Sequence, residues 1–247
     1  MGLKHVRYRS LRELLEHELI RDEEPATAEL VRRLRPVKRR GWFSRHEFLE
    51  MCRWKSPRAL RHYEKNSSAT IRGLSRAVLA TRSERRRLAL LTSLPGVSVP
   101  MASAILTLID PRRYGVIDIR VWQLLFAIKS VGRNPHGRAF TFEHWQHFLR
   151  RLRHHARELD VPVRAIEYTL FECHKKLQRG TLYDARVRTR RGWGGGMLTA
   201  GRAPSRSEAR RAAARPAPGG RTRRRTPAPP PADPPGTARD RAAGRAT

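Results

Sequence analysis

The sequence is poor in the residues that mark secreted, membrane-spanning and metal-cluster proteins. Only two of its 247 residues are cysteine, Cys52 and Cys173, which excludes a disulfide framework and a four-cysteine iron–sulfur cluster. It has no apolar run of the length that crosses a bilayer. The first residues, MGLKHVRYRSLRELL, lack the apolar core of a signal peptide. We therefore expect a reduced, cytoplasmic protein with no membrane partner.

Acidic residues and lysines are also scarce. The sequence has 22 Asp and Glu against 53 Lys and Arg, which gives a formal net charge of +31. Only seven of the 53 basic residues are lysine, so guanidinium groups carry nearly all of the positive charge. Arginine binds phosphate through two parallel hydrogen bonds and keeps its charge at physiological pH. Such an excess is typical of nucleic-acid binding, so we expect a polyanionic partner and a location on the nucleoid.

Large apolar residues almost disappear after residue 180. Residues 181–247 hold nine of the 17 prolines and nine of the 17 glycines, with 16 Arg against four acids. A segment of this composition cannot bury enough apolar surface to offset its chain entropy. We expect residues 1–180 to form the folded domain, with a net charge of +19. Residues 181–247 are expected to form a disordered basic tail, either a phosphate-binding arm or a dispensable extension.

Apolar residues up to residue 180 recur at the helical period nearly throughout, and no alternating strand pattern is found. Helix starts are predicted from residues that cap or open helices, namely Pro25, Ser44 with Glu47, Ser67, Ser83, Thr141 and Pro162. The folded domain is therefore expected to be all-α, with roughly eight to ten helices of ordinary length.

One pair of helices is joined by a tight turn in the stretch LPGVSVPMASAIL, at 94–106. A basic segment precedes the turn at Pro95 and Gly96, and VPMASAILTLI follows it. This second helix is apolar on nearly every side and must be buried, and the small residues Ala102–Ala104 let the first helix approach closely. The amides around Val97–Val99 begin the helix without intrahelical partners. Together with the helix dipole they form a phosphate site that reads no base sequence.

The stretch LPGVSVPMASAILTLIDPRRYGVIDIRVWQLL, at 94–125, resembles the hairpin region of the helix-hairpin-helix DNA glycosylases. This family includes endonuclease III, the adenine glycosylase that acts on mismatches and 8-oxoguanine glycosylase. It shows LPGVG at the hairpin, small residues in the second helix, and Val-Asp-x-His/Arg-Val at the start of the next helix. That aspartate is Asp118 here. The resemblance implies two helical lobes that flank a cleft, one of residues 25–112 with the hairpin at about 83–109, the other of the N-terminal helix and residues 113–180.

The resemblance implies that Asp118 is the catalytic carboxylate of a base-excision enzyme. Cleavage of an N-glycosidic bond develops positive charge on the sugar, and a nearby carboxylate stabilises that charge or orients the attacking water. The nucleotide has to be flipped out of the duplex, because the bond is otherwise shielded. The alternative role for Asp118 is to cap the helix that begins IRVWQLL, by accepting a hydrogen bond from the amide of Arg120 or Val121. The two roles are compatible.

Three departures from the family pattern limit the chemistry. Members that also cut the strand use a lysine of the second hairpin helix as an imine-forming nucleophile. Pro100 stands at that position here, so strand cleavage by that route is excluded, and the spacing of Lys55 or Lys129 suggests no substitute. The iron–sulfur cluster of many relatives cannot form, and Ser98 replaces the second glycine of the turn. The one cofactor left open is a monovalent cation at the hairpin.

The predicted DNA contacts come from the hairpin and from basic residues elsewhere. The hairpin contributes Pro95, Gly96, Val97, Ser98 and Val99, and the stretch RWKSPR contributes Lys55 and Arg58 as phosphate contacts. Arg120 either reaches DNA or faces solvent, and Trp54 is interpreted as core rather than as a base-stacking residue.

Four histidines, His144, His147, His154 and His155, suggest a metal site at first sight. They follow Thr141 on one predicted helix and lie mostly opposite its apolar stripe. No cysteine or carboxylate is found that completes a ligand set with them, so no metal site is expected.

The leading hypothesis is a monomeric, monofunctional DNA glycosylase that hydrolyses the N-glycosidic bond of a flipped damaged or mispaired base in duplex DNA. A second hypothesis is a non-catalytic helix-hairpin-helix DNA-binding protein, for which the missing lysine and the altered turn are signs of lost catalysis. A third hypothesis, an RNA-binding protein with a basic tail, predicts tighter binding to single-stranded RNA than to duplex DNA. The sequence does not identify the base, because the residues of a base pocket come from distant helices.

Overall fold

The structure is a computed structural model that describes residues 2–3, 5–180 and 182; the predicted tail at 181–247 lies outside these residues except for residue 182. The described part contains ten α-helices, which confirms the all-α prediction. They are α1 (Leu11–Glu18), α2 (Pro25–Arg40), α3 (Arg45–Lys55), α4 (Leu60–Tyr63), α5 (Ser68–Ala80), α6 (Glu84–Thr92), α7 (Val99–Ile109), α8 (Ile119–Ala127), α9 (Phe142–Glu158) and α10 (Val163–Leu177), with a 3₁₀ turn η1 (Pro57–Ala59) before α4.

The helices begin where the sequence predicts. Pro25 is the first residue of α2, and Pro162 directly precedes α10. Ser44 and Glu47 form the predicted capping box of α3, in which the Glu47 amide donates to Ser44 Oγ at 3.2 Å and the Ser44 amide donates to Glu47 Oε2 at 2.7 Å. The helices α5, α6 and α9 are capped in the same position by Ser67, Ser83 and Thr141. These starts were predictable because a cap depends on residues three apart in the chain.

Two very short strands differ from the expectation of no strands. β1 (Gly2–Leu3) pairs antiparallel with β2 (Gln178–Arg179), with Gly2 opposite Arg179 and Leu3 opposite Gln178. A strand of two residues has no alternation of apolar and polar positions that a sequence pattern could reveal.

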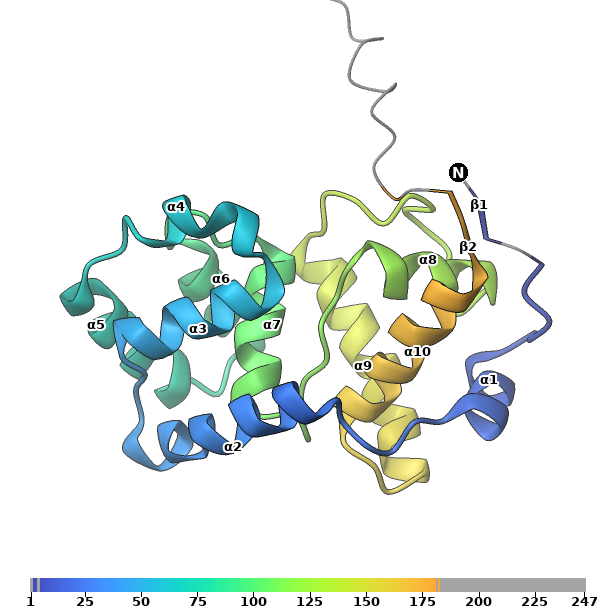
Figure 1. Cartoon of the computed structure of the whole chain (residues 1–247), viewed down its shortest axis with the longest axis horizontal. Coiled ribbons are helices and arrows are strands. Elements are labelled where there is room, and N and C mark those ends of the chain that lie inside the picture. Colours follow the sequence, from blue (N-terminus) through green and yellow to red (C-terminus); the bar gives the residue numbers. More distant parts are fainter. Residues whose placement is uncertain (1, 4, 181, 183–247) are drawn as a thin grey trace, which may run out of the picture. The chain divides into compact units, whose positions relative to one another are not determined.

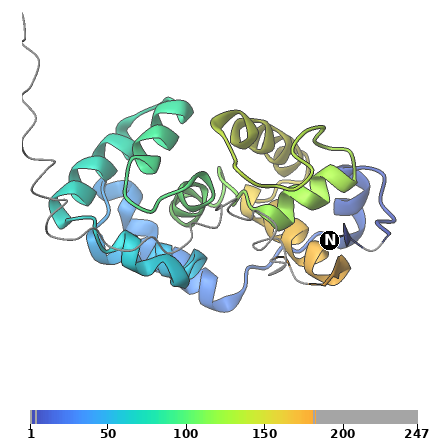
Figure 2. The ribbon, with the colours of Figure 1, turned by 90° about the horizontal axis from the view of Figure 1, so that it is seen from above.

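The helices pack in two groups, which we call the first group and the second group. In the first group α2, α3 and α6 contact α7, and α5 contacts α3 and α6. In the second group α10 contacts α1, α8 and α9. In both ribbon views α7 lies between the other helices of the first group and those of the second (Figures 1 and 2). The chain passes from the second group to the first between α1 and α2, and it returns in the segment 110–118, directly after α7.

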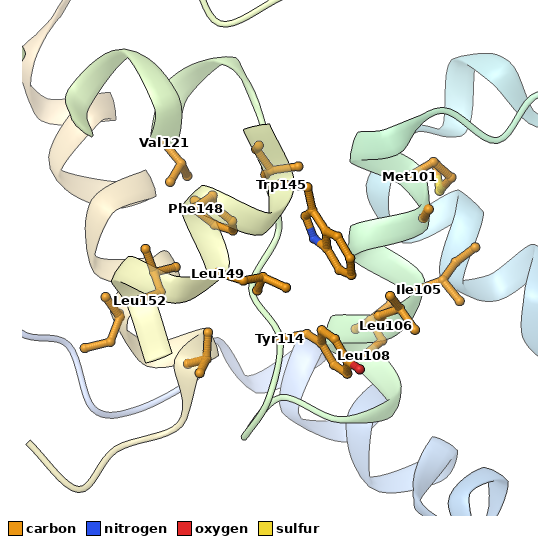
Figure 3. Close-up of a cluster of buried hydrophobic side chains, with 14 of the residues drawn as sticks. Met101, Ile105, Leu106, Leu108, Tyr114, Val121, Trp145, Phe148, Leu149 and Leu152 are labelled. Carbon is orange, nitrogen blue, oxygen red and sulfur yellow. The ribbon is translucent and has the colours of Figure 1, made fainter. Parts of the chain in front are cut away.

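One hydrophobic cluster runs through both groups. All of α7 from Met101 to Ile109 is buried, as its composition predicts. Figure 3 shows Trp145 of α9 and Tyr114 beside α7, and the two rings stack with their centroids 6.2 Å apart. Burial of apolar surface stabilises a protein by about 25 cal/mol per Å². The shared cluster therefore holds the two groups together at α7.

Both cysteines are buried and free. Burial raises the pKa of Cys52 to about 12 and that of Cys173 to about 11, so both remain protonated and unreactive thiols at neutral pH. Among the described helices, none is both long enough and apolar enough to cross a membrane.

Candidate functional site

The turn between α6 and α7 is held by specific contacts. Gly96 has φ +84°, in the left-handed region, and a Cβ at this position would lie 2.8 Å from His62 Cβ and 3.0 Å from a ring carbon of Tyr63. Asn66 donates from Nδ2 to the carbonyl of Pro95 at 3.1 Å. Only glycine combines this backbone conformation with so close an approach, so the turn is fixed against the end of α4 and against Asn66, which follows it.

The amides of the turn differ in part from the prediction. The amide of Val97 donates to the carbonyl of Leu94 at 3.0 Å, and Val97 is buried, so the expectation that this amide faces outward is wrong. The first bond inside α7 is donated by Ala102. The amides of Ser98 and Val99, which precede it, make no hydrogen bond within the described part of the chain, and Ser98 is exposed. The outward-facing donors therefore begin one residue later than predicted.

Asp118 is the N-cap of α8, as one of its two predicted roles requires. Its Oδ1 accepts a hydrogen bond from the amide of Val121 at 3.1 Å. The segment that leads to it is bonded to α7, because the Ile117 amide donates to Ser103 Oγ at 3.1 Å and Ser103 Oγ donates to the Pro100 carbonyl at 2.8 Å. The small residue Ser103 thus places Asp118 relative to the start of α7.

Lys55 pairs with the same carboxylate. Its Nζ donates to Asp118 Oδ2 at 2.8 Å, and the two side chains are only 20% and 16% exposed. Lys55 is the last residue of α3, and Asp118 directly precedes α8. The pair therefore joins the two groups of helices at one half-buried point. Lys55 was predicted as a phosphate contact, and in the structure its ammonium group forms an ion pair with Asp118.

One of the predicted hairpin residues, Ser98, and the carboxylate of Asp118 line the same cavity of about 360 Å³. Its wall includes Ser98, Lys55, Arg58, Asp118 and Arg120. The structure thus brings together residues of the turn, the end of α3, the turn η1 and the start of α8. The exposed residues Pro95 and Gly96 lie beside this wall in the chain, and Val99 is half-buried at the start of α7.

Arg58 and Arg120 differ in how they meet this cavity. Arg58 is exposed. Arg120 is half-buried, donates from Nη1 to Gln178 Oε1, and has its guanidinium 5.6 Å from the centroid of the Phe171 ring. Arg120 is therefore neither free in solvent nor detached from the predicted site.

A second cavity of about 420 Å³ lies on the α10 side of the Lys55 and Asp118 pair. It is lined by three aromatic side chains, Trp54, Tyr168 and Phe171, and by polar groups from α2 and α10. Trp54 is half-buried and donates from Nε1 to Thr27 Oγ1 at 2.9 Å. The interpretation of Trp54 as an ordinary core residue is therefore incomplete, because one side of this ring faces a cavity.

A buried charge cluster lies in the wall of this second cavity. Arg164 of α10 donates from Nε to Glu23 Oε2 at 2.6 Å and from Nη1 to Glu167, one turn further along α10. The side chains of Arg164 and Glu167 are 10% and 2% exposed. Two charged residues on the buried face of the helix at 163–177 are a signal of a functional or structural network, and the sequence reasoning missed it.

Burial controls the ionisation of this cluster. Burial raises the pKa of Glu167, the cation of Arg164 lowers it, and the nearby charge of Asp118 raises it, with a net rise. Burial alone would lower the pKa of Arg164, but the carboxylates of Glu167 and Glu23 raise it above its ordinary value. The ion pair therefore does not fully offset the cost of burying the Glu167 carboxylate. Asp118 thus has a carboxyl neighbour whose pKa lies above its ordinary value.

His174 is a further neighbour of this region that the sequence reasoning did not single out. It is buried, and its Nε2 lies 3.1 Å from Gln123 Oε1. Burial, with the charge of Arg120 as the next cause, lowers the pKa of His174 to about 4. The imidazole is therefore neutral at physiological pH.

The histidines of α9 lie in two places. His144 and His147 line a separate cavity of about 490 Å³ with Trp122. His154 and His155 lie with Glu158 so that one possible ligand atom of each falls within 4.8 Å of the others. The statement that no carboxylate completes a set was wrong, because Glu158 is one turn from His154 on the same helix.

The oxygens at the hairpin give only partial support for a monovalent cation. The carbonyls of Leu94 and Pro95 already accept hydrogen bonds from Val97 and Asn66. Asn66 Oδ1 is buried without a hydrogen-bond partner. One such oxygen does not make a cation site.

Comparison of the chain with protein-family models, with curated proteins and with solved structures finds no match.

Proposed function

We propose that this chain is a monofunctional helix-hairpin-helix DNA glycosylase, which hydrolyses the N-glycosidic bond of a flipped, damaged or mispaired base in duplex DNA. The observation that carries the proposal is the cavity of about 360 Å³, whose wall contains both the start of α7 and the carboxylate of Asp118. A nucleotide in this cavity would meet a phosphate site and an anion at once. The chain would act as a monomer in the cytoplasm, on the DNA of the nucleoid.

The phosphate grip comes from α7 and its neighbours. The amides of Ser98 and Val99 have no partner in the described chain, and they lie at the positive end of the α7 dipole. Arg58 adds a guanidinium group to the same cavity. These groups recognise the DNA backbone and not the base, which suits an enzyme that must scan any sequence.

The base pocket is the cavity of about 420 Å³. A flipped base is bound by stacking on aromatic rings and by hydrogen bonds to its edge. Trp54, Tyr168 and Phe171 supply the rings, and Thr27 and Glu167 supply polar atoms. Because Lys55 and Asp118 line both cavities, the sugar between phosphate and base would lie against this pair.

Asp118 supplies the negative charge that the reaction needs. As the glycosidic bond breaks, its electron pair leaves with the base and positive charge develops on the sugar. The carboxylate stabilises this charge or orients the water that attacks the sugar. Lys55 partly neutralises Asp118 in the free protein, since Lys55 Nζ and Asp118 Oδ2 are 2.8 Å apart. A DNA phosphate that attracts Lys55 would release the carboxylate when substrate is bound.

The test is base release from duplexes that each carry one lesion or mismatch. Wild-type protein is expected to release a free base from at least one duplex of the panel. Asp118→Asn is expected to lower the rate by about a hundredfold or more, a typical cost of removing an electrostatic group from a site. The matched control Asp22→Asn changes an exposed acid outside both cavities and is expected to keep the wild-type rate. Equal rates for wild type and Asp118→Asn would overturn the enzymatic proposal.

The second candidate is a DNA-binding protein without catalysis, and the ion pair of Lys55 with Asp118 favours it. A carboxylate held at both oxygens, by Lys55 and by the amide of Val121, has a purely structural use. This candidate predicts duplex binding with no base release from any member of the panel. Tighter binding to single-stranded RNA than to duplex DNA would contradict both candidates.

A further inference from the structure

A second region of concentrated positive charge lies at the other end of α7, away from the hairpin. Five arginines, Arg112, Arg113, Arg150, Arg153 and Arg157, surround one surface cavity of about 530 Å³, which we call the arginine hollow. The first two follow the C-terminal end of α7, and the others lie on the second half of α9. An α-helix rises about 1.5 Å per residue, so the 11 residues of α7 separate the hollow from the hairpin by about 16 Å.

Backbone hydrogen bonds hold together the segments that line the hollow, which are the segment after α7, the second half of α9 and the turn that leads into α10. The amide of Arg164 at the start of α10 donates to the Pro111 carbonyl at 3.0 Å, which fixes the segment that carries Arg112 and Arg113. The turn after α9 is closed by the Val161 amide, which donates to the Ala156 carbonyl at 3.0 Å. The hollow therefore belongs to the packed part of the protein.

Two of the five arginines are held in place by other groups. Arg153 donates from Nε to the Arg113 carbonyl at 2.8 Å and from Nη2 to Glu84 Oε1 at 2.9 Å. Arg113 reaches the same Glu84 oxygen at 3.3 Å. Glu84 itself is not part of the wall of the hollow. These contacts fix two guanidinium groups before any ligand arrives, which lowers the cost of ordering them on binding.

The other three arginines have no such partner. Arg112, Arg150 and Arg157 are exposed, and none of them makes an ion pair or side-chain hydrogen bond within the described residues. Asp160 is the one acid in the wall of the hollow. Like charges around one concave surface repel each other and raise the local concentration of anions. The protein thus neutralises the charge of the hollow only in part, through Glu84 and Asp160, and the three exposed arginines leave it positive.

We propose that the arginine hollow binds consecutive phosphate groups. Guanidinium groups match phosphate oxygens in a bidentate geometry and stay charged, and five of them suit a ligand with several negative charges. The volume of about 530 Å³ has room for more than one phosphate group. Such groups are supplied either by a free polyphosphate or by a nucleic-acid strand. A strand in the hollow would be additional to the duplex at the hairpin, because the two sites lie at opposite ends of α7.

The first test is titration of the full chain with inorganic tripolyphosphate at low salt, followed by calorimetry. The variant Arg150→Gln/Arg157→Gln removes two exposed, unpartnered charges of the hollow. The matched control Arg35→Gln/Arg39→Gln removes two exposed, unpartnered charges from α2. The hollow variant is expected to bind tripolyphosphate about tenfold more weakly or worse, while the control stays within about twofold of wild type. An equal loss in both variants would show a general effect of positive charge and overturn the proposal.

The second measurement locates the ligand without any substitution. Phenylglyoxal modifies accessible arginines, and mass spectrometry of peptides identifies which ones. Tripolyphosphate is expected to protect Arg112, Arg150 and Arg157 more than Arg35 and Arg39. Equal modification of both sets with and without tripolyphosphate would overturn the proposal.

Two further arms separate the source of the phosphate groups and the dependence on catalysis. In one outcome, the hollow variant also binds a short single-stranded oligonucleotide more weakly than wild type does. If the slope of log K against log salt concentration then falls by about one per lost phosphate contact, the ligand is a strand. If only tripolyphosphate loses affinity, the ligand is a free polyphosphate. Asp118→Asn is expected to bind tripolyphosphate like wild type, so a failure of the proposed glycosylase activity would leave this result intact.

Discussion

The two ends of α7 carry positive charge in opposite ways. At the N-terminal end, Lys55 is paired with Asp118. In the neighbouring cavity of about 420 Å³, Arg164 is likewise paired, with Glu23 and Glu167. At the C-terminal end, three exposed arginines of the arginine hollow have no partner among the described residues. Paired and half-buried charges fix geometry, which is what a reacting centre requires. Unpaired charges wait for a ligand, which is what a binding surface requires.

The largest expected effect comes from breaking the buried charge cluster at Arg164. Arg164→Met leaves the buried Glu167 carboxylate without its cation, and we expect a loss of about 3–5 kcal/mol in the free energy of unfolding. Urea denaturation measures this loss. The control Arg32→Met removes a pair with Glu29 whose side chains are 65% and 48% exposed, and it is expected to leave the free energy of unfolding close to the wild-type value. Similar losses for both variants would contradict the difference between buried and exposed pairs.

The next effect tests the turn that leads into the paired end. Gly96→Ala puts a Cβ within 3.0 Å of two neighbours at a positive φ, and it is expected to destabilise the fold by about 1–3 kcal/mol and to weaken duplex binding. Gly73→Ala is the control, because Gly73 lies inside α5 with nothing within 4 Å of an added Cβ. It is expected to stabilise the fold by about 0.5–1 kcal/mol. Thermal unfolding and a duplex titration measure both variants.

A third comparison asks what Lys55 contributes to the reaction. Lys55→Met removes the cation that a substrate phosphate would attract away from Asp118, so the nucleotide is positioned less well and base release is expected to fall by about tenfold to a hundredfold. Lys55→Arg keeps the positive charge and is expected to stay within about threefold of wild type. Loss of activity in both variants, together with a product that borohydride links covalently to wild-type protein, would instead identify Lys55 as an amine nucleophile.

The smallest effect concerns the acid that organises the arginine hollow. Burial raises the pKa of Glu84, but its contacts with Arg153, Tyr114 and Arg87 outweigh burial, and the net pKa is lowered. A carboxylate of this kind contributes stability above its unfolded pKa, near 4.5, and loses that contribution as the pH falls through the folded value. The free energy of unfolding of wild type is expected to fall as the pH drops below about 5. In Glu84→Gln this fall is expected to be smaller, by about 1 kcal/mol or less. An unchanged pH profile would show that Glu84 does not hold Arg113 and Arg153.

The features that could be predicted from the sequence are those that depend on neighbouring residues. The cap of α8 by Asp118, the buried α7 and the turn at Gly96 each follow from a few consecutive residues. The contact of Lys55 with Asp118 joins residues 63 apart in the chain, and no spacing rule reveals it. The arginine hollow needs the end of α7 to meet α9 and the start of α10, which only the tertiary packing decides.

The prediction that the amide of Val97 faces outward failed for a physical reason. The amides at the start of a helix are free only if the preceding turn does not use them. The turn at Gly96 is tight enough for the Val97 amide to reach the carbonyl of Leu94. The local sequence gives the position of the turn but not the hydrogen bond that closes it.

The burial of α7 from Met101 to Ile109 affects how the two groups of helices respond to change. Because Met101–Ile109 are buried and the cluster extends into both groups, neither group has a separate apolar core. Amide protons in the middle of α7 can then exchange with solvent only when the whole molecule opens. The hairpin and the arginine hollow therefore stand at the two ends of a helix that we expect to exchange slowly. Each site is supported by the global stability of the fold and not by local rigidity alone.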